Sequence, residues 1–284
     1  MAKPFLKWAG GKRWLISSGI QYAPVHYKTY REPFLGGGAA FFDQEPDDFV
    51  LSDLNGELIA CYQGIKESHK KFQTKLSEHD RHHSPEYYYK VRDAKPTAPY
   101  SKAARFVYLN RTCFNGLYRV NRQGKFNVPI GTATSAKYEK DDFKSVANLL
   151  SKGTLLNSDF AKNITNAKKG DFLFVDPPYT VRHNANGFIQ YNEKIFSWQD
   201  QIRLRDLLVA AAKRGAKATI TNANHPSVIE LYENYGNIEV TSRASLISGN
   251  TNSRGKTTEI LIRLGWKVTQ PTDVMEGEIV SVVS

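Results

Sequence analysis

Short apolar runs that end in polar or glycine-containing turns recur along the chain and alternate with segments of helical periodicity. A short run without polar interruptions predicts a strand of a parallel sheet, because such a strand is covered on both faces. Strands are expected near residue 30 and at residues 49–51, 154–157, 172–175, 216–221, 238–241 and 258–264. Helices are expected at residues 14–20, 56–66, 101–111, 143–150, 199–214 and 226–232. This alternation predicts an α/β fold with a mostly parallel sheet.

The stretch from residue 66 to residue 136 has a different character. Charged and aromatic residues are dense there, and the alternation of strand and helix does not continue through it. Asn-Gly at 115–116 and Gln-Gly at 123–124 are turn signals, which predict a hairpin in its last part. We therefore expect one α/β domain made of residues 1–65 and 137–284, interrupted by an inserted module of helices and a hairpin at residues 66–136.

The charge of the chain favours a polyanionic partner. Lys and Arg outnumber Asp and Glu by 11 in 284 residues, and hydrophobic residues make up 40%, enough for a large core. Nucleic acid is favoured over a membrane surface because no amphipathic basic helix stands out. The alternative is that the positive charge serves only solubility. Neither the cysteines nor the histidines have the spacing of metal ligands, so no metal site is expected.

Three further features predict a cytoplasmic protein. No apolar stretch approaches the ~20 residues that a membrane span requires. The N-terminal residues do not have the pattern of a signal peptide. Cys61 and Cys113 lie far apart in the sequence and are most simply free thiols in a reducing compartment.

The strand expected at residues 172–175 runs into Asp176-Pro177-Pro178-Tyr179. The prolines cannot continue the strand, so a carboxylate and an aromatic ring remain at its carboxyl end, where ligands bind in open α/β sheets. The Asp176 carboxylate and the Pro177 carbonyl can accept hydrogen bonds from a planar amine, and Tyr179 offers a face for the ring that carries this amine. The alternative is a plain turn, because Asp-Pro-Pro is also common in turns.

Two glycine-containing turns predict a site for a nucleotide-like ligand. Gly10-Gly11-Lys12 follows Trp8 and precedes an expected helix, which is typical of a cradle for a polar ligand. The glycines at residues 36–38 lie between a strand and a helix, as in a nucleotide-binding βα unit. Asp53 ends the second strand, where an acid can hold ribose hydroxyls. Capping of the next helix is the alternative role for Asp53, but Asn55 can also provide this cap.

These motifs resemble those of a known enzyme family. The segment at residues 176–179 is similar to motif IV of the adenine-N6 methyltransferases, Asp-Pro-Pro-Tyr, and residues 5–12 resemble motif X, Phe-x-Lys-Trp-x-Gly-Gly-Lys. Phe34-x-Gly36-x-Gly38 resembles motif I. Over about residues 5–264 the chain resembles the Dam-type (alpha-group, D12 class) site-specific DNA adenine-N6 methyltransferases. The resemblance implies a Rossmann-like methyltransferase with a seven-stranded sheet, S-adenosylmethionine as the methyl donor, and double-stranded DNA as the partner.

The resemblance also implies roles for single residues. The implied catalytic residues are Asp176, Pro177, Pro178 and Tyr179. The implied cofactor contacts are Trp8, Gly11, Lys12, Phe34, Gly36, Asp53, Asp159, Phe160 and Asp176. Within this set, Asp159 and Phe160 follow the strand expected at residues 154–157 and would lie beside the adenine ring of the cofactor. The alternative for Asp159 is an ordinary helix cap, because a helical turn follows it.

The expected hairpin carries the implied DNA contacts. Arginine, asparagine and aromatic side chains on a short projection suit readout of the major groove. The Asn-Gly-Leu-x-Arg and Phe-Asn-Val-Pro segments are similar to the recognition hairpin of the Dam family. The similarity implies that Arg119 reads a guanine, that Phe114 fills the space of a flipped adenine, and that the target is GATC. The family commonly has Tyr where Phe114 stands, so stacking is kept and a hydroxyl contact is lost. Further implied DNA contacts are Lys7, Asn115, Leu117 and Pro129, of which Leu117 and Pro129 press on the outer bases.

Two polar loops and the biological context complete the expectations. Residues 181–187 are expected to form a flexible flap over the substrate, and residues 248–256 a mobile loop near phosphate. The alternatives for function are an RNA or protein-amide N-methyltransferase and a non-catalytic DNA-binding relative. The sequence is compatible with a companion restriction endonuclease, as in restriction-modification, and with an enzyme that acts alone. No obligate protein partner is expected.

Overall fold

The computed structural model describes residues 2–121, 124–182, 196–244 and 256–268. The described strands form a seven-stranded sheet in the order β3-β2-β1-β4-β5-β7-β6. Strand β7 pairs antiparallel with β5 and β6, and the other neighbours pair in parallel. The expected α/β fold with a mostly parallel seven-stranded sheet is therefore confirmed. The strands are β1 (Tyr30–Glu32), β2 (Phe49–Asp53), β3 (Thr154–Asn157), β4 (Phe172–Val175), β5 (Lys217–Ala223), β6 (Asn237–Ala244) and β7 (Lys256–Leu264).

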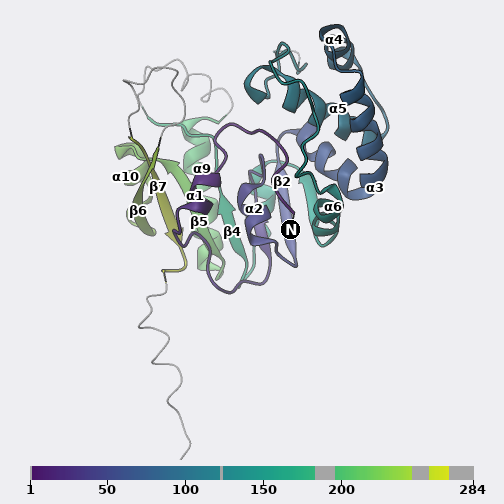
Figure 1. Cartoon of the computed structure of the whole chain (residues 1–284). Coiled ribbons are helices and arrows are strands. Elements are labelled where there is room, and N and C mark those ends of the chain that lie inside the picture. The colour runs from purple at the N-terminus through teal and green to yellow at the C-terminus, as the bar shows by residue number, and fades with distance from the viewer. Residues whose placement is uncertain (1, 122–123, 183–195, 245–255, 269–284) are drawn as a thin grey trace, which may run out of the picture.

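Alternation of side chains along the strands gives the sheet two hydrophobic faces. In β4, Phe172 and Phe174 belong to the core on one face, whereas Leu173 and Val175 belong to the core on the other. Helices α1 and α2 contribute to the first core, and α7, α9 and α10 contribute to the second (Figure 1). Burial on both faces explains why β4 contains only apolar residues. These helices are α1 (Arg13–Ser17), α2 (Ala39–Gln44), α7 (Phe160–Thr165), α9 (Trp198–Lys213) and α10 (Pro226–Tyr232).

A further group of helices lies beside the edge of the sheet formed by β2 and β3 (Figure 1). Its first helix, α3, begins where expected, because the Asn55 side chain accepts a hydrogen bond from the Leu58 amide at 3.1 Å. The expected end near residue 66 is wrong, since α3 continues to Arg81 with one break in its helical dihedral angles at Ser68. The predicted start of the inserted module therefore lies inside a helix. The group comprises α3 (Gly56–Arg81), α4 (Pro85–Asp93), α5 (Pro99–Thr112), the 3-10 turn η1 (Phe114–Gly116) and α6 (Phe143–Ser151).

Arg111 fastens this helical group to the N-terminal segment. Its guanidinium is fully buried and donates to both carboxylate oxygens of Asp141, at 2.6 and 2.7 Å. It also donates to the Phe5 carbonyl at 3.1 and 2.9 Å and to the Ala136 carbonyl at 2.8 Å. A buried charge is tolerated when it is paired and hydrogen-bonded in this way. The N-terminal segment that carries Lys7, Trp8 and Lys12 is thereby held against α5.

Residues 113–130, called the recognition loop below, fold back as two antiparallel segments. Isolated bridges pair Cys113 with Ile130 and Val120 with Phe126. Asn115 and Gly116 adopt positive φ angles of 54° and 63°, which an Asn-Gly pair accommodates at little cost. The chain reverses direction between Val120 and Phe126, where the Asn121 amide donates to the Lys125 carbonyl at 2.8 Å, whereas Asn115-Gly116 makes a tight turn within the first segment.

Some expectations differ from the structure or lie beyond its described part. The first helix was expected at residues 14–20 but ends at Ser17, two residues before Gly19 with its φ of 75°. Most of the expected flap at residues 181–187 and almost all of the expected loop at residues 248–256 lie outside the described residues. Among the helices that the structure describes, none combines the length and apolar character that a membrane crossing requires.

Candidate active site

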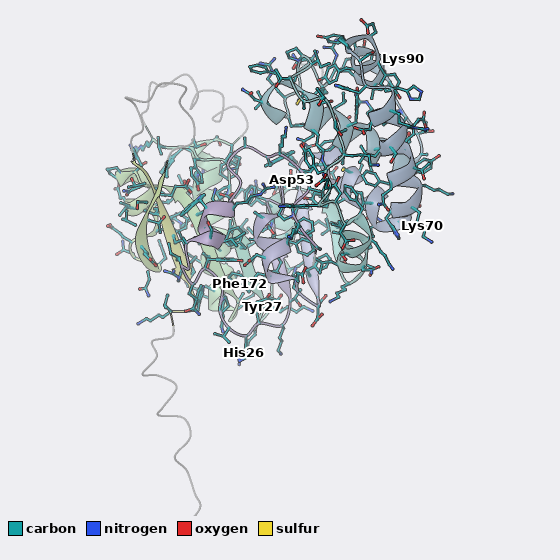
Figure 2. All side chains as sticks on the ribbon, viewed as in Figure 1. His26, Tyr27, Asp53, Lys70, Lys90 and Phe172 are labelled. Atoms are coloured by element: carbon teal, nitrogen blue, oxygen red, sulfur yellow. The ribbon has the colours of Figure 1, made fainter. Side chains whose placement is uncertain are left out.

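The sequence-predicted acids meet at the carboxyl edge of the sheet. Asp53 ends β2 and Asp176 follows β4, and β1 lies between these two strands. Figure 2 shows Asp53 at this edge and Phe172, the first residue of β4, at the opposite edge. The chain order reverses between β1 and β4, and in open α/β sheets ligands bind at such a switch point, outside the carboxyl ends of the strands.

One oxygen of the Asp176 carboxylate is held by two donors. Lys12 Nζ lies 2.8 Å from Asp176 Oδ1, and the Thr221 hydroxyl donates to the same oxygen at 2.6 Å. No described residue donates a hydrogen bond to the second oxygen, Oδ2. The side chain is 21% exposed, so it lies at a surface and not in the core. Asp176 therefore has a fixed orientation, and its Oδ2 accepts no hydrogen bond from the described part of the chain.

Lys12 bridges two carboxylates. The side chain is 4% exposed, and Nζ lies 3.7 Å from Glu259 Oε2 on β7 in addition to its contact with Asp176. Nζ also donates to the Gly10 carbonyl at 2.8 Å and lies 5.0 Å from the centre of the Tyr179 ring. Glu259 is 3% exposed and accepts the Tyr179 hydroxyl at 2.6 Å. One cation and two anions thus form a buried network that fixes the Tyr179 ring beside Asp176.

Burial shapes the protonation of the neighbouring groups. The pKa of Tyr179 is raised well above its ordinary value, mainly by burial and further by the charges of Asp176 and Glu259, so the phenol stays protonated and donates. Burial likewise raises the pKa of Glu32, which ends β1 and accepts the Tyr30 hydroxyl at 2.8 Å. Glu32 is therefore inclined to be neutral, and the formal negative charge of this edge resides on the other acids.

Side chains from α9 and β5 support the loop at residues 176–179. Gln201 Nε2 donates to the Pro178 carbonyl at 3.4 Å, and Asn222 Nδ2 donates to Gln201 Oε1 at 3.2 Å. The Thr180 hydroxyl donates to the Phe196 carbonyl at 2.6 Å. Gln201, Asn222 and Thr180 are all fully buried. Such a network of satisfied buried amides holds the loop in a single conformation.

The predicted glycine turn, Trp8 and Asp53 meet at one place. A Cβ atom on Gly36 would lie 2.8 Å from Trp8 Nε1, so only glycine allows the indole this approach. The Gly36 amide donates to Asp53 Oδ2 at 3.0 Å, and the Asn55 amide donates to Oδ1 at 2.9 Å. Burial raises the pKa of Asp53, and these backbone donors act against that shift. The Gly11 amide donates to the Trp8 carbonyl at 3.3 Å and closes the first glycine turn, and the Trp8 ring against Gly36 brings this turn beside the second.

Asp159 and Phe160 have structural partners. The Asp159 carboxylate caps α7 by accepting the Ala161 amide at 2.9 Å, and it also pairs with Arg203. Phe160 is buried, its ring is stacked at 5.3 Å with that of Phe34, and the Arg203 guanidinium lies 4.5 Å from its centre. The capping role considered for Asp159 is therefore present. Contact of these residues with a cofactor stays a prediction.

The recognition loop exposes the side chains predicted to contact DNA. Phe114 is 53% exposed and Leu117 is 41% exposed, and exposed apolar side chains that lie together are typical of an interaction surface. Arg119 is exposed, and its Nε donates to Asn127 Oδ1 at 3.2 Å. Lys7 lies against the same loop, where its side chain approaches the backbone of Gly116. Asn115 and Pro129 are exposed as well. The loop thus presents apolar, cationic and amide groups together.

Sequence reasoning missed Glu259 and Thr221. Glu259 is a charged residue within the expected strand at residues 258–264, among Ile260, Leu261 and Ile262. A carboxylate in such a run is a signal of a buried ion pair, because an unpaired buried charge is costly. Thr221 gave no comparable signal, since a threonine in a strand is ordinary. Its contact with Asp176 depends on the position of β5 beside β4.

The fold and the site together define the class of the protein. A seven-stranded sheet with this strand order, with an Asp-Pro-Pro-Tyr loop at its switch point, is that of a Rossmann-like methyltransferase. A family model described as D12 class N6 adenine-specific DNA methyltransferase matches residues 8–246. The chain belongs to this family and is an enzyme that methylates adenine N6 in DNA. The match to this family supports DNA as the substrate over the alternatives of RNA or a protein amide.

Relatives of similar length support the same assignment. The chain is 37% identical to the Type II methyltransferase M1.LlaDCHI of Lactococcus lactis subsp. cremoris, over 92% of this chain and 94% of the relative. It is 33% identical to the Type II methyltransferase M.MjaIII of Methanocaldococcus jannaschii, over 92% and 98%. It is 30% identical to the DNA adenine methylase of Haemophilus influenzae, over 93% and 94%.

Proposed function

We propose that the protein transfers the methyl group of S-adenosylmethionine to the N6 amine of adenine within GATC in double-stranded DNA. The observation that carries the proposal is the state of Asp176. Two donors hold its Oδ1, and no described residue donates to its Oδ2. A carboxylate held in this way at a sheet edge is suited to accept a hydrogen bond from an exocyclic amine.

The residues at the edge of the sheet fit S-adenosylmethionine. The Asp53 carboxylate suits ribose hydroxyls, and the Trp8 ring covers the glycine turn where a nucleoside would approach the backbone. Asp176, Glu259 and Lys12 carry a formal charge of minus one together, which suits a cationic sulfonium. When bound, S-adenosylmethionine supplies an electrophilic methyl group. We propose that Trp8, Gly11, Lys12, Phe34, Gly36, Asp53, Asp159, Phe160 and Asp176 hold it.

The chain's own residues would prepare the amine for attack. Adenine N6 is a poor nucleophile because its lone pair is delocalised into the ring. Hydrogen bonds from its two N–H groups to Asp176 Oδ2 and to the Pro177 carbonyl would pull N6 towards tetrahedral geometry, so that its lone pair is localised on the nitrogen and points at the methyl group. Tyr179, whose hydroxyl is held by Glu259, would stack on the base. Positioning would supply most of the acceleration, and Asp176 or water would take the proton that the product loses.

The recognition loop would supply the sequence specificity. An adenine inside a duplex cannot reach Asp176, so the base has to flip out. Exposed Phe114 is suited to fill the space that the base leaves, and exposed Arg119 is suited to pair with a guanine. The exposed Leu117 and Pro129 would press on the outer bases, and Lys7 and Asn115 would lie against the DNA.

Methyl transfer to matched substrates tests this proposal. Labelled S-adenosylmethionine is offered with a duplex that contains one GATC, with duplexes changed at one base of that site, and with RNA of the same sequence. We expect label in N6-methyladenine of the GATC duplex only. Equal labelling of the altered duplexes would remove the GATC assignment, and labelling of the RNA would change the substrate class.

A companion restriction endonuclease is a further part of the proposal. Two of the relatives described above are named Type II methyltransferases, and this name supports such a partner. Cleavage of unmethylated GATC by an extract of the source cells, and its absence after treatment of the DNA with this enzyme, would support the pairing. An extract without such a nuclease would indicate an enzyme that acts alone.

A further inference from the structure

The rings of Trp8 and Tyr118 are stacked, with centres 5.7 Å apart and planes 23° apart. Trp8 covers the glycine turn at Gly36 and Gly37, where Cβ atoms would lie within 3.0 Å of it. Tyr118 belongs to the recognition loop and directly precedes Arg119. The stack therefore joins the proposed cofactor pocket to the proposed DNA-reading loop.

Tyr118 is tethered on its other sides as well. Its hydroxyl donates to Glu57 Oε2 at 2.8 Å, and Glu57 lies in the first turn of α3, close after Asp53. Its ring contacts those of Phe106 and Phe126, with centres 5.1 and 5.7 Å away. Tyr118 thus touches α3, α5 and both segments of the recognition loop. A side chain with this many fixed contacts has little freedom to move independently of Trp8.

A second connection runs beside the stack. Asn110 is buried, and its side-chain Nδ2 donates to the Lys7 backbone carbonyl at 2.8 Å. Its Oδ1 accepts the Lys7 backbone N–H at 2.9 Å. A Cβ atom on Gly116 would lie 2.3 Å from Lys7 Cδ, so the loop backbone is in close contact with Lys7. Residues 7 and 8 therefore both rest on the recognition loop. These contacts make the position of Trp8 and the position of the loop depend on each other.

We infer that Tyr118 is a positioning residue that couples occupancy of the cofactor pocket to the binding of the target duplex. The inference rests on the proposed function. A ligand that fixes Trp8 also fixes Tyr118 and the loop that carries Arg119, so the second ligand binds to a loop that is already ordered. Coupling of this kind is reciprocal, and each ligand tightens the other by the same factor.

Binding measured in both directions tests the inference. The dissociation constant of S-adenosylhomocysteine is measured without and with saturating GATC duplex, and that of the duplex without and with S-adenosylhomocysteine. For the natural protein we expect the same tightening, on the order of tenfold, in both directions. In Tyr118→Leu we expect this factor to fall to about one to two, with each ligand still bound alone. A merely structural role of Tyr118 would not change the ratio.

Two further variants complete the experiment. Tyr118→Phe keeps the stack but loses the bond to Glu57, so an intermediate factor of about three is expected. Tyr235→Leu removes an exposed tyrosine that contacts Arg205 and should keep the full factor. If the ratio of dissociation constants without and with the second ligand is unchanged in Tyr118→Leu, the inference is overturned. If the leucine variant does not fold, an unchanged ratio in Tyr118→Phe overturns it. A natural protein that binds both ligands without coupling overturns it too. Failure to bind either ligand would instead count against the proposed function.

Discussion

Lys12 Nζ lies 2.8 Å from Asp176 Oδ1, although one residue belongs to the N-terminal segment and the other follows the fourth strand. The same ammonium group lies 3.7 Å from Glu259. Two acids and one cation from distant parts of the chain therefore converge where the sheet order reverses. Lys12 and Glu259 are tolerated in their buried positions because each is paired, and Asp176 completes the pairing from the partly exposed edge of the site.

Removal of the cation should destabilise the fold. In Lys12→Met, Asp176 and Glu259 lose their shared partner, and we expect the free energy of unfolding to fall by about 3 kcal/mol. Adding Glu259→Gln removes one of the two negative charges that Lys12 balances, so the double variant should regain at least about 1 kcal/mol. Denaturant unfolding of the single and double variants measures both values. Simple addition of two losses would contradict the proposed network.

The Tyr179 ring and its hydroxyl should contribute separately. Tyr179→Phe keeps the ring and loses the bond to Glu259, so we expect a stability loss of about 1 kcal/mol and methyl transfer close to normal. Tyr179→Leu removes the stacking surface, and kcat/KM should fall by the equivalent of about 1–3 kcal/mol. Steady-state kinetics on the GATC duplex separates the two. Equal activity of the two variants would mean that the ring does not touch the base.

Arg119 should govern discrimination at one base pair. For Arg119→Ala we expect the binding free energy for the GATC duplex to weaken by about 1–3 kcal/mol. Binding to a duplex in which the guanine is already replaced should weaken little further. Lys125→Ala, an exposed cation on the same loop, is the matched control and should weaken binding to all duplexes alike. Competition between duplexes gives both results. A uniform loss in Arg119→Ala would reassign the residue to a phosphate contact.

His79 should make the helical group sensitive to acid. Burial lowers the pKa of His79 from 6.5 to about 4, and its Nδ1 lies 2.9 Å from the Tyr87 hydroxyl. As the pH falls, His79 takes up a proton in the unfolded chain before it does so in the folded protein. Its contribution to stability is therefore fully present above pH 6.5 and is lost as the pH falls towards 4. At pH 5 the loss should be about 2 kcal/mol. In His79→Gln the fall in unfolding free energy between pH 7.5 and pH 5 should be smaller by about this amount. An equal fall in both proteins would exclude His79 as the cause.

Much of the fold could be predicted because the order of apolar and polar residues was clear within single short segments. The strands at residues 154–157 and 172–175 and the helix Pro226–Tyr232 have the predicted bounds. The second half of α3 was not predicted, since its many charged residues hide a buried stripe. The stripe consists of Phe72, Leu76 and His79, spaced as on one helical face. A search for that spacing would have found it.

The candidate site was predictable to the extent that it consists of motifs. The positions of Trp8, Lys12, Asp53 and Asp176 follow from contiguous patterns, and the structure brings them to one edge of the sheet. The contacts of Thr221 and Glu259 could not be predicted, because they depend on how separate strands lie side by side. In the antiparallel pairing of β5 with β7, Ala223 is opposite Glu259, which brings this carboxylate to the edge where Asp176 lies.

Replacement of Asp176 tests the central claim most directly. Single-turnover methyl transfer to a GATC duplex is measured for Asp176→Ala, together with the affinity for the same duplex. Asp206→Ala on α9 is the matched control, since this acid is exposed and is not among the residues of the proposed site. We expect Asp176→Ala to lose about 10²–10³-fold or more in rate, while duplex affinity changes little and the control is unaffected. A rate for Asp176→Ala close to that of the natural protein would contradict the assignment of Asp176 as the group that holds the amine.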